Sequence, residues 1–161
     1  MADYTATART NYFLVKDVDA LKAELRTYGI NPATWAENQR GAEFVLDDGA
    51  DNKPVGAIAL FSSGTWPEMD EDSVAMRLEI EDEETPVPGA YVDLTGLIAN
   101  HLVEGQVAVF MGVGFEAMRY LGGAAVAVNA AGETRRIDLE DIYAVAKELT
   151  TDEHPVTFAQ Y

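Results

Sequence analysis

Carboxylates are the side chains of this chain that could perform the widest range of chemistry, and they are concentrated between Trp66 and Glu84. This acidic run contains one base, Arg77, and nine carboxylates, which are Glu68, Asp70, Glu71, Asp72, Glu79, Glu81, Asp82, Glu83 and Glu84. Such a group could carry out acid–base chemistry, hold a divalent cation, or present an anionic surface to a basic partner. Acid–base chemistry needs a pocket and a raised pKa, and the carboxylates of this polar run should stay solvated and ionised. The run therefore favours an anionic binding surface over an active site.

Other motifs with chemical meaning are incomplete. The acidic turn at residues 47–52 and the carboxylates at 70–72 do not have the ligand spacing of a calcium loop. His101 and His154 share no metal-ligand spacing, and the serines at positions 62 and 63 lack the preceding glycine of a nucleophile elbow. The chain has no cysteine, which excludes disulfides, thiolate zinc sites and thiol catalysis. We therefore expect no catalytic residues, no metal site, no cofactor and no enzymatic activity.

One glycine motif matches part of the dinucleotide-binding fingerprint. Residues 112–117 read G-x-G-x-x-A directly after a predicted strand, and Glu133 follows at about the expected distance. The fingerprint requires a long helix after the glycines, but Gly122 and Gly123 interrupt the sequence too early. We therefore interpret the motif as a strand followed by a turn.

The charge of the chain restricts its partners. The 161 residues carry a net charge of −17, and residues 41–104 alone contribute −13, from fifteen acids and two bases. A surface of this sign does not neutralise phosphates, so direct binding of nucleic acid is not expected, and anionic membranes should repel it. The first residues do not resemble a signal peptide, and no apolar run is long enough to cross a bilayer. We expect a cytoplasmic protein whose partner is basic.

Apolar periodicity and turn residues predict the elements that position these groups. Three helices are predicted, each preceded by a capping aspartate, at Asp17, Asp93 and Asp138. Strands are predicted at residues 5–15, 34–37, 43–46, 55–62, 106–113, 122–129 and 133–137. The last helix has the clearest pattern, with Asp141 in the capping-box position and an apolar stripe of Leu139, Ile142, Val145, Ala146 and Leu149.

A further strand is predicted inside the acidic run, at residues 74–80. Val74, Met76, Leu78 and Ile80 occupy every second position, which is the pattern of a half-buried strand. Same-face residues on a strand are about 6.7 Å apart, a spacing similar to that of successive phosphates on a nucleic-acid strand. The predicted binding residues are therefore Asp70, Glu71, Asp72, Glu79, Glu81, Asp82, Glu83 and Glu84.

The order of elements defines the expected fold class. Strands occur in runs rather than alternating with helices, which favours an α+β fold with a mostly antiparallel or mixed sheet and about three helices. No linker divides the chain, so we expect a single domain over residues 1–150 and a C-terminal tail at 151–161.

Three segments carry a resemblance to a known family. The opening at residues 7–17, TARTNYFLVKD, resembles the start of small uncharacterised proteins encoded by bacteriophages and plasmids. Residues 109–123 and 136–143 are similar to the later part of the same proteins. The resemblance covers about half of the chain and does not include the acidic run. It implies an accessory protein of a mobile element and brings no assigned activity with it.

Charge and resemblance together lead to one functional hypothesis. We expect a non-enzymatic acidic protein that presents a DNA-mimicking face and inhibits a nucleic-acid-binding defence protein of the host, as antirestriction and anti-CRISPR proteins do. The alternative is a structural or virion-associated protein, or a salt-adapted protein, whose acidity only serves solubility; the scarcity of lysine, four of eleven bases, suits salt adaptation. A third possibility, an enzyme that uses a divalent ion held by the carboxylates, predicts a thermal shift on adding that ion.

Overall fold

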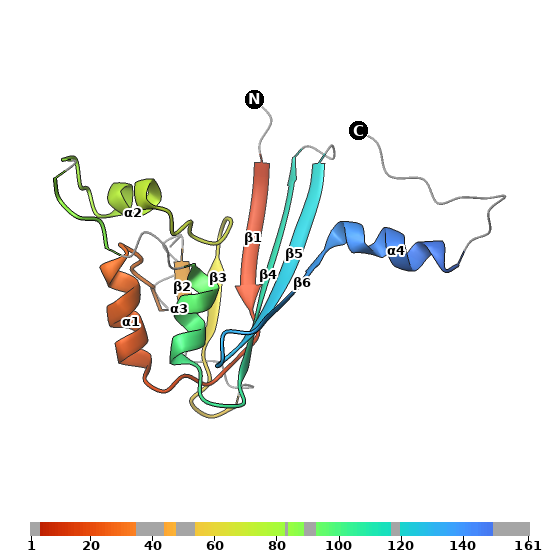
Figure 1. Ribbon diagram of the computed structural model, residues 1–161, viewed down its shortest axis with the longest axis horizontal. Helices are drawn as coiled ribbons and strands as arrows, with labels where there is room; N and C mark the ends of the chain where they lie inside the picture. Colours follow the sequence, from red (N-terminus) through yellow and green to blue (C-terminus); the bar gives the residue numbers. More distant parts are fainter. Residues whose placement is uncertain are drawn as a thin grey trace.

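The computed structural model describes residues 4–34, 44–47, 54–82, 84–88, 93–116 and 120–149 (Figure 1). Along the chain, these residues form β1 (Tyr4–Thr10), α1 (Val18–Thr27), β2 (Phe44–Asp47), β3 (Ala59–Ser62), α2 (Glu71–Arg77), α3 (Leu94–His101), β4 (Val107–Glu116), β5 (Tyr120–Asn129), β6 (Thr134–Asp138), the 3₁₀ turn η2 (Leu139–Asp141) and α4 (Ile142–Lys147). The α+β fold in a single domain, expected from the order of elements, is confirmed.

The strands form one six-stranded sheet in the order β2-β3-β1-β4-β5-β6. Every pair of neighbouring strands is antiparallel, as the runs of strands in the sequence predicted. The register places Val113 of β4 opposite Thr7 of β1 and Gly123 of β5. Since residues paired across antiparallel strands share a face, this register assigns each side chain to one of the two faces of the sheet.

One face of the sheet builds the core together with α1 and α3, which lie side by side against it (Figure 1). Both helices begin at the predicted aspartate caps, Asp17 and Asp93. Leu21 and Leu25 of α1 and Leu97 of α3 are fully buried, as the helical spacing of apolar residues requires. They meet Phe110 and other even-numbered residues of β4 within a single apolar cluster.

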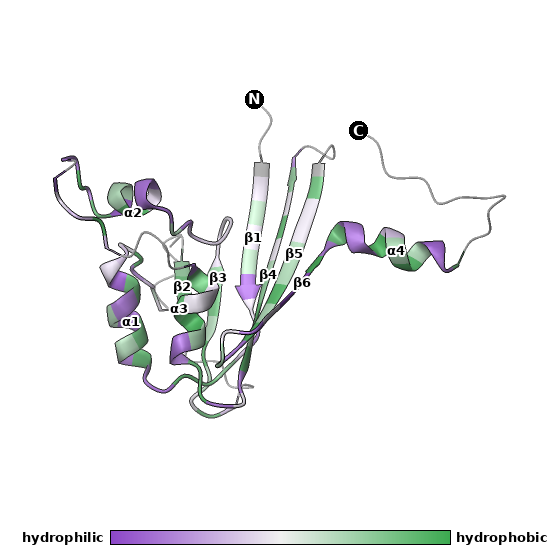
Figure 2. Ribbon diagram, in the orientation of Figure 1, coloured by the Kyte–Doolittle hydropathy of each residue, from purple (hydrophilic) through white to green (hydrophobic). Residues whose placement is uncertain are grey.

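The opposite face of β1, β4, β5 and β6 carries side chains that point away from α1 and α3; we call it the open face. Its large apolar residues are 38–66% exposed, and they are Val107, Met111, Val113, Phe115, Leu121 and Ile137. Figure 2 shows β4 and β5 in pale to deep green, the colour of apolar residues, along much of their length, whereas β1 is mostly pale and β6 mostly purple. This face therefore leaves a broad apolar area in contact with solvent.

The last helix leaves the body of the domain. β6 ends at Asp138, η2 begins at Leu139, and α4 extends away from the sheet, on the right of Figure 1. Asp141 accepts a hydrogen bond from the backbone N–H of Asp138 at 2.6 Å, so the predicted capping interaction forms. The apolar stripe of this helix is exposed rather than buried.

The main error of the sequence prediction concerns residues 74–80, which were expected to form a strand. Residues 71–77 form α2 instead, so the described residues contain four helices rather than the three expected. Val74 and Leu78, four residues apart, face the core, whereas Met76 is 75% exposed; this is the periodicity of a helix. Met69 and Val74 are both buried at the two positions of a hydrophobic staple, before and after the Asp70 cap.

Smaller differences concern the ends of elements. The strand predicted at 55–62 begins only at Ala59, because the chain turns at Pro54–Ala57 and leaves Val55 98% exposed. The strand predicted at 34–37 lies mostly outside the described residues, although Ala33 forms an isolated parallel bridge with Val45. The predicted tail at 151–161 also lies outside the described residues. Gly112 and Gly114 lie within β4, which continues to Glu116 instead of opening a helix.

Candidate functional site

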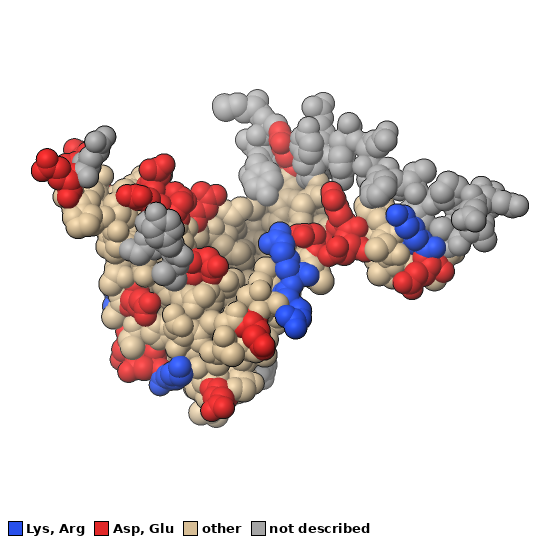
Figure 3. Space-filling view, in the orientation of Figure 1, with Lys and Arg blue, Asp and Glu red and all other residues tan. Residues whose placement is uncertain are grey.

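The predicted binding residues lie on and just after α2. Seven of them are exposed and form what we call the acidic surface, which consists of Asp70, Glu71, Asp72, Glu79, Glu81, Asp82 and Glu84. Glu83, also predicted, lies outside the described residues. Figure 3 shows acidic side chains gathered on this corner of the molecule, at the upper left. The helix separates the carboxylates into two groups, residues 70–72 at its start and residues 79–84 beyond its end.

This arrangement does not have the regular spacing of strand residues that was expected to match the spacing of successive phosphates on a nucleic-acid strand. Glu79 and Glu81 were expected about 6.7 Å apart on one strand face, but they follow the end of a helix. The surface is therefore an irregular group of charges rather than a linear array.

Two carboxylates of the acidic surface also stabilise the local backbone through hydrogen bonds. Asp70 accepts a hydrogen bond from the Ser73 backbone N–H at 2.9 Å and caps α2. Asp82 accepts from the Thr85 backbone N–H and from the Thr85 hydroxyl, both at 2.7 Å. The hydrogen bonds from Ser73 hold the pKa of Asp70 below its ordinary value, and those from Thr85 do the same to the pKa of Asp82. Both groups therefore stay ionised into the acidic range.

The single base of the acidic run turns away from these carboxylates. Arg77 donates from Nε to the Tyr28 carbonyl oxygen at 3.0 Å and from Nη2 to the Glu68 carbonyl oxygen at 2.7 Å. Its guanidinium therefore connects the ends of α1 and α2 through backbone groups, and it forms no ion pair with the carboxylates of the acidic surface that the structure describes. Its charge makes a minor contribution to the lowered pKa of Asp70, behind the hydrogen bonds from Ser73.

Glu79 occupies a position where glycine is preferred. Its φ of 56° makes it the only non-glycine residue with positive φ in the described part of the chain. The Ile80 N–H bonds to the Ala75 carbonyl at 3.0 Å and the Glu79 N–H to the Met76 carbonyl at 3.3 Å, which is the Schellman arrangement. α1 ends in the same way, with Gly29 at φ 71°. Glu79 thus lowers the stability of the folded protein in two ways, through its left-handed backbone and through its negative charge at a helix C-terminus.

A groove of about 670 Å³ adjoins the acidic surface. Its lining combines apolar side chains, among them Ile30, Trp66 and Met76, with polar ones such as Glu68 and Arg77, so a hollow of mixed character lies beside α2. The half-buried Trp66 ring packs edge-on against Phe44 and Phe110, with centroids 6.4 and 5.2 Å away, which fixes its position. Sequence analysis did not select this groove. The available signal was Trp66 itself, a large aromatic residue in a loop of turn residues.

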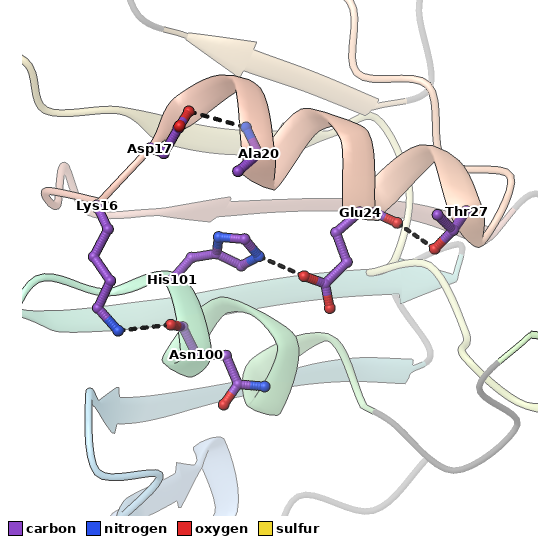
Figure 4. A network of polar contacts seen from close by, with 7 residues as sticks. All are labelled: Lys16, Asp17, Ala20, Glu24, Thr27, Asn100 and His101. Carbon is purple, nitrogen blue, oxygen red and sulfur yellow. Dashed lines mark hydrogen bonds and ion pairs between the residues drawn. The ribbon is translucent and has the colours of Figure 1, made fainter.

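His101, considered in the sequence as a lone histidine, pairs with Glu24. Its Nε2 lies 2.6 Å from Glu24 Oε2, and this contact joins α3 to α1 (Figure 4). Nearby, the Lys16 ammonium donates to the Asn100 carbonyl oxygen at 2.9 Å. These contacts connect the two core helices, and His101 is not part of the acidic surface. His154, the other histidine, lies outside the described residues.

Comparisons of the chain with protein-family models, with curated proteins and with solved structures found no match. Within the described ranges, no three acidic or histidine side chains come together in a way that could hold a metal ion. None of the helices in the part of the chain that the structure describes is long and apolar enough to span a membrane. The acidic surface and its groove are therefore the features of the described residues that bear on function.

Proposed function

We propose that this chain is a non-enzymatic binding protein of a mobile element, whose acidic surface blocks a basic, nucleic-acid-binding defence protein in the cytoplasm of the host. The seven described carboxylates would occupy a site built for phosphates. Strong charge complementarity of this kind directs association and confers specificity. The resemblance to proteins of bacteriophages and plasmids supports the setting.

The observation that carries the proposal is Glu79. A chain optimised for stability would have glycine at this position, as α1 does at Gly29. A glutamate there costs stability in the backbone and in the helix dipole. Residues that violate local rules tend to mark functional sites, and this one adds a carboxylate at the start of the second acidic group. A requirement for solubility alone would be met at less strained positions.

The groove supports the same proposal by supplying an apolar anchor. Binding energy at protein interfaces concentrates in a few buried aromatic or aliphatic contacts surrounded by polar residues. Ile30, Trp66 and Met76 line a hollow whose rim includes Glu68 and the start of α2. A long basic side chain, such as arginine, could place its stem in this hollow and its charge among the carboxylates.

Two matched variants test the proposal. The acidic-surface variant carries Glu71→Gln, Asp72→Asn and Glu81→Gln, and it leaves the two structural carboxylates untouched. The control variant carries Asp19→Asn, Glu104→Gln and Glu133→Gln, at exposed positions elsewhere. Each variant removes three negative charges from the total of −17. A non-specific polyanion effect would therefore weaken both variants equally.

Each protein is immobilised and exposed to a bacterial host lysate at about 50 mM and about 500 mM salt. The wild type and the control variant should retain a nucleic-acid-binding protein at low salt and release it at high salt. The acidic-surface variant should retain at least about tenfold less of it. If the wild type captures no nucleic-acid-binding protein, the proposed function is contradicted.

A structural or virion-associated role is the second candidate, and the open face of the sheet favours it. An exposed apolar area of this size is typical of proteins that assemble. In that case, the charges of the acidic surface could be neutralised without effect on assembly, although solubility would fall.

A further inference from the structure

We propose that two copies of this chain form a symmetric dimer in which each copy lays η2 and α4 across the open face of the other. Such an exchange joins two surfaces that are exposed within the described part of the chain, and it uses no other component. It is independent of the acidic surface, which lies on α2 at another part of the molecule.

The open face is suited to burial because its described residues include only one carboxylate, Glu133, which lies at its edge just before β6 and accepts a hydrogen bond from the Asn129 side chain at 2.7 Å. On β1, β4, β5 and β6, the residues in register on this face are apolar or small, apart from threonines, one asparagine and two arginines, Arg9 and Arg135. The chain as a whole has twenty-eight acids, and an exposed sheet face would ordinarily carry several of them for solubility. Their scarcity here indicates that this face does not remain in water.

The exposed stripe of η2 and α4 is the matching surface. Leu139, Ile142, Val145 and Leu149 recur at helical spacing and are 45–88% exposed. A helix with such a stripe gains its stability from burial against another element. Figure 2 shows this apolar side on a helix that lies clear of the rest of the described chain.

The junction between β6 and η2 directs the helix away from its own sheet (Figure 1). No loop residue separates β6 from η2, and the Asp138–Asp141 hydrogen bond at 2.6 Å fixes the turn. Arg136 adds an ion pair to Asp138 at 2.8 Å. Leu139 lies against the open face at Gly123, where an added Cβ would approach its side chain to 3.0 Å. The helix thus starts at the open face and is directed outward, toward a second molecule.

The area available is sufficient for a stable dimer. Ten large apolar side chains on the two surfaces are at least 38% exposed, and together they present on the order of 1,000 Å² per chain. The largest apolar patch of an ordinary monomer is about 300–600 Å², and a standard interface buries about 800 Å² per partner. A twofold exchange would bury both surfaces of both copies at once.

Charge favours the same arrangement. The open face carries the cations Arg9 and Arg135 in a strongly acidic chain, and the polar side of the exchanged segment carries Glu140 and Glu148. The carboxylates of the acidic surface lie elsewhere, so at physiological salt, where the screening length is about 8 Å, their repulsion does not oppose the contact. A second copy therefore meets a surface of opposite sign at this position.

Light scattering after size exclusion, at about 10 µM protein and about 0.3 M salt, tests the dimer. The wild type should have twice the chain mass of 17.5 kDa. A helix variant, Ile142→Glu with Val145→Glu, and a sheet variant, Val113→Glu with Phe115→Glu, should each have the mass of one chain. The control, Val55→Glu, adds a single negative charge at an apolar position that is 98% exposed elsewhere, and it should remain a dimer.

Mixing the two variants provides the decisive result. A pair made of one helix variant and one sheet variant keeps one intact helix-on-sheet contact, so a dimer absent from either sample should form in the mixture. Recovery on mixing also demonstrates that both variants are folded. A wild type with the mass of one chain would overturn the proposal. So would a helix variant that stays dimeric, since the sheets would then pair directly, or a mixture that forms no dimer.

Discussion

Arg77 and Tyr28 connect the ends of two helices: the Arg77 Nε donates to the Tyr28 carbonyl oxygen at 3.0 Å. A second bond, from Nη2 to the Glu68 carbonyl, fixes the other edge of the guanidinium. The arrangement has two consequences. It anchors α2 to the domain through a charge-assisted contact, and it removes the only cation of the acidic run from the carboxylates around it.

Arg77→Met should lower the free energy of unfolding by about 1–3 kcal/mol, because two carbonyl groups lose a charged donor. Chemical denaturation measures the change. Arg26→Met is the matched control, since Arg26 lies in the last turn of α1 as Arg77 does in α2, and is exposed. That control should cost less than about 1 kcal/mol. Equal effects of the two substitutions would show that the carbonyl bonds contribute little.

Glu79→Gly should raise the free energy of unfolding by about 0.5–1 kcal/mol while weakening capture of the partner. The left-handed backbone at φ 56° costs glutamate about 1 kcal/mol or more and costs glycine almost nothing. Glu81→Gly, in the segment without positive φ, should give no such gain. A fall in stability for Glu79→Gly would mean that the carboxylate, rather than the backbone, dominates at this position.

Gly29→Ala should destabilise the protein by at least about 2 kcal/mol. A Cβ at Gly29 would approach Arg77 Cβ to 2.6 Å and the Arg77 carbonyl carbon to 3.1 Å, and the residue would also adopt φ 71°. Gly132→Ala separates the two causes, because Gly132 has φ +78° with no atom within 4 Å of the added carbon. It should cost about 1 kcal/mol, as thermal or chemical unfolding can measure.

Asp93, the cap of α3, should make stability depend on pH. The Thr95 hydroxyl and the Gly96 N–H each donate to its Oδ1 at 2.6 Å, and these bonds hold its pKa below the ordinary 3.8. Since the folded pKa is lowered, the contribution is present above pH 3.8 and is lost as the pH falls through the folded pKa. Asp93→Asn keeps the cap without the charge.

The wild type should therefore be more stable than Asp93→Asn at about pH 6, and the difference should shrink toward zero at about pH 2 to 3. Denaturation curves across this range measure it. Glu104→Gln, an acid-to-amide change in the exposed turn before β4, should show a much smaller dependence. A difference for Asp93→Asn that grows on acidification would contradict the assigned direction of the pKa.

The sequence predicts most of this fold because its local signals agree with its tertiary structure. Asp17, Asp93 and Asp138 start helical segments where capping requires, and the continuous apolar run of β4 indicates a strand. The error at residues 74–80 has a specific cause. Val74, Met76, Leu78 and Ile80 satisfy a period of two, but the Asp70 cap and the acids after it are helix-start signals, and burial follows Val74 and Leu78.

The candidate site is less predictable because it depends on distant segments. The charge count identifies the acidic surface, but not the Trp66 groove, which is assembled from α2, the end of α1 and β2. The unusual φ of Glu79 is also absent from the residue pattern, since glutamate ordinarily indicates helix. Likewise, the apolar stripe on the last helix is evident in the sequence. Its exposure is not, because it depends on the direction that the chain takes after β6.

The central claim, that the acidic surface replaces a phosphate backbone, is tested most directly by competition for the captured partner. Labelled duplex DNA bound to that partner is titrated with the wild type, the acidic-surface variant and the control variant at fixed salt. The wild type and the control should displace the DNA at similar concentrations, and the acidic-surface variant should need at least about tenfold more. The claim is contradicted if the two variants compete equally, or if the partner holds DNA and this protein at the same time.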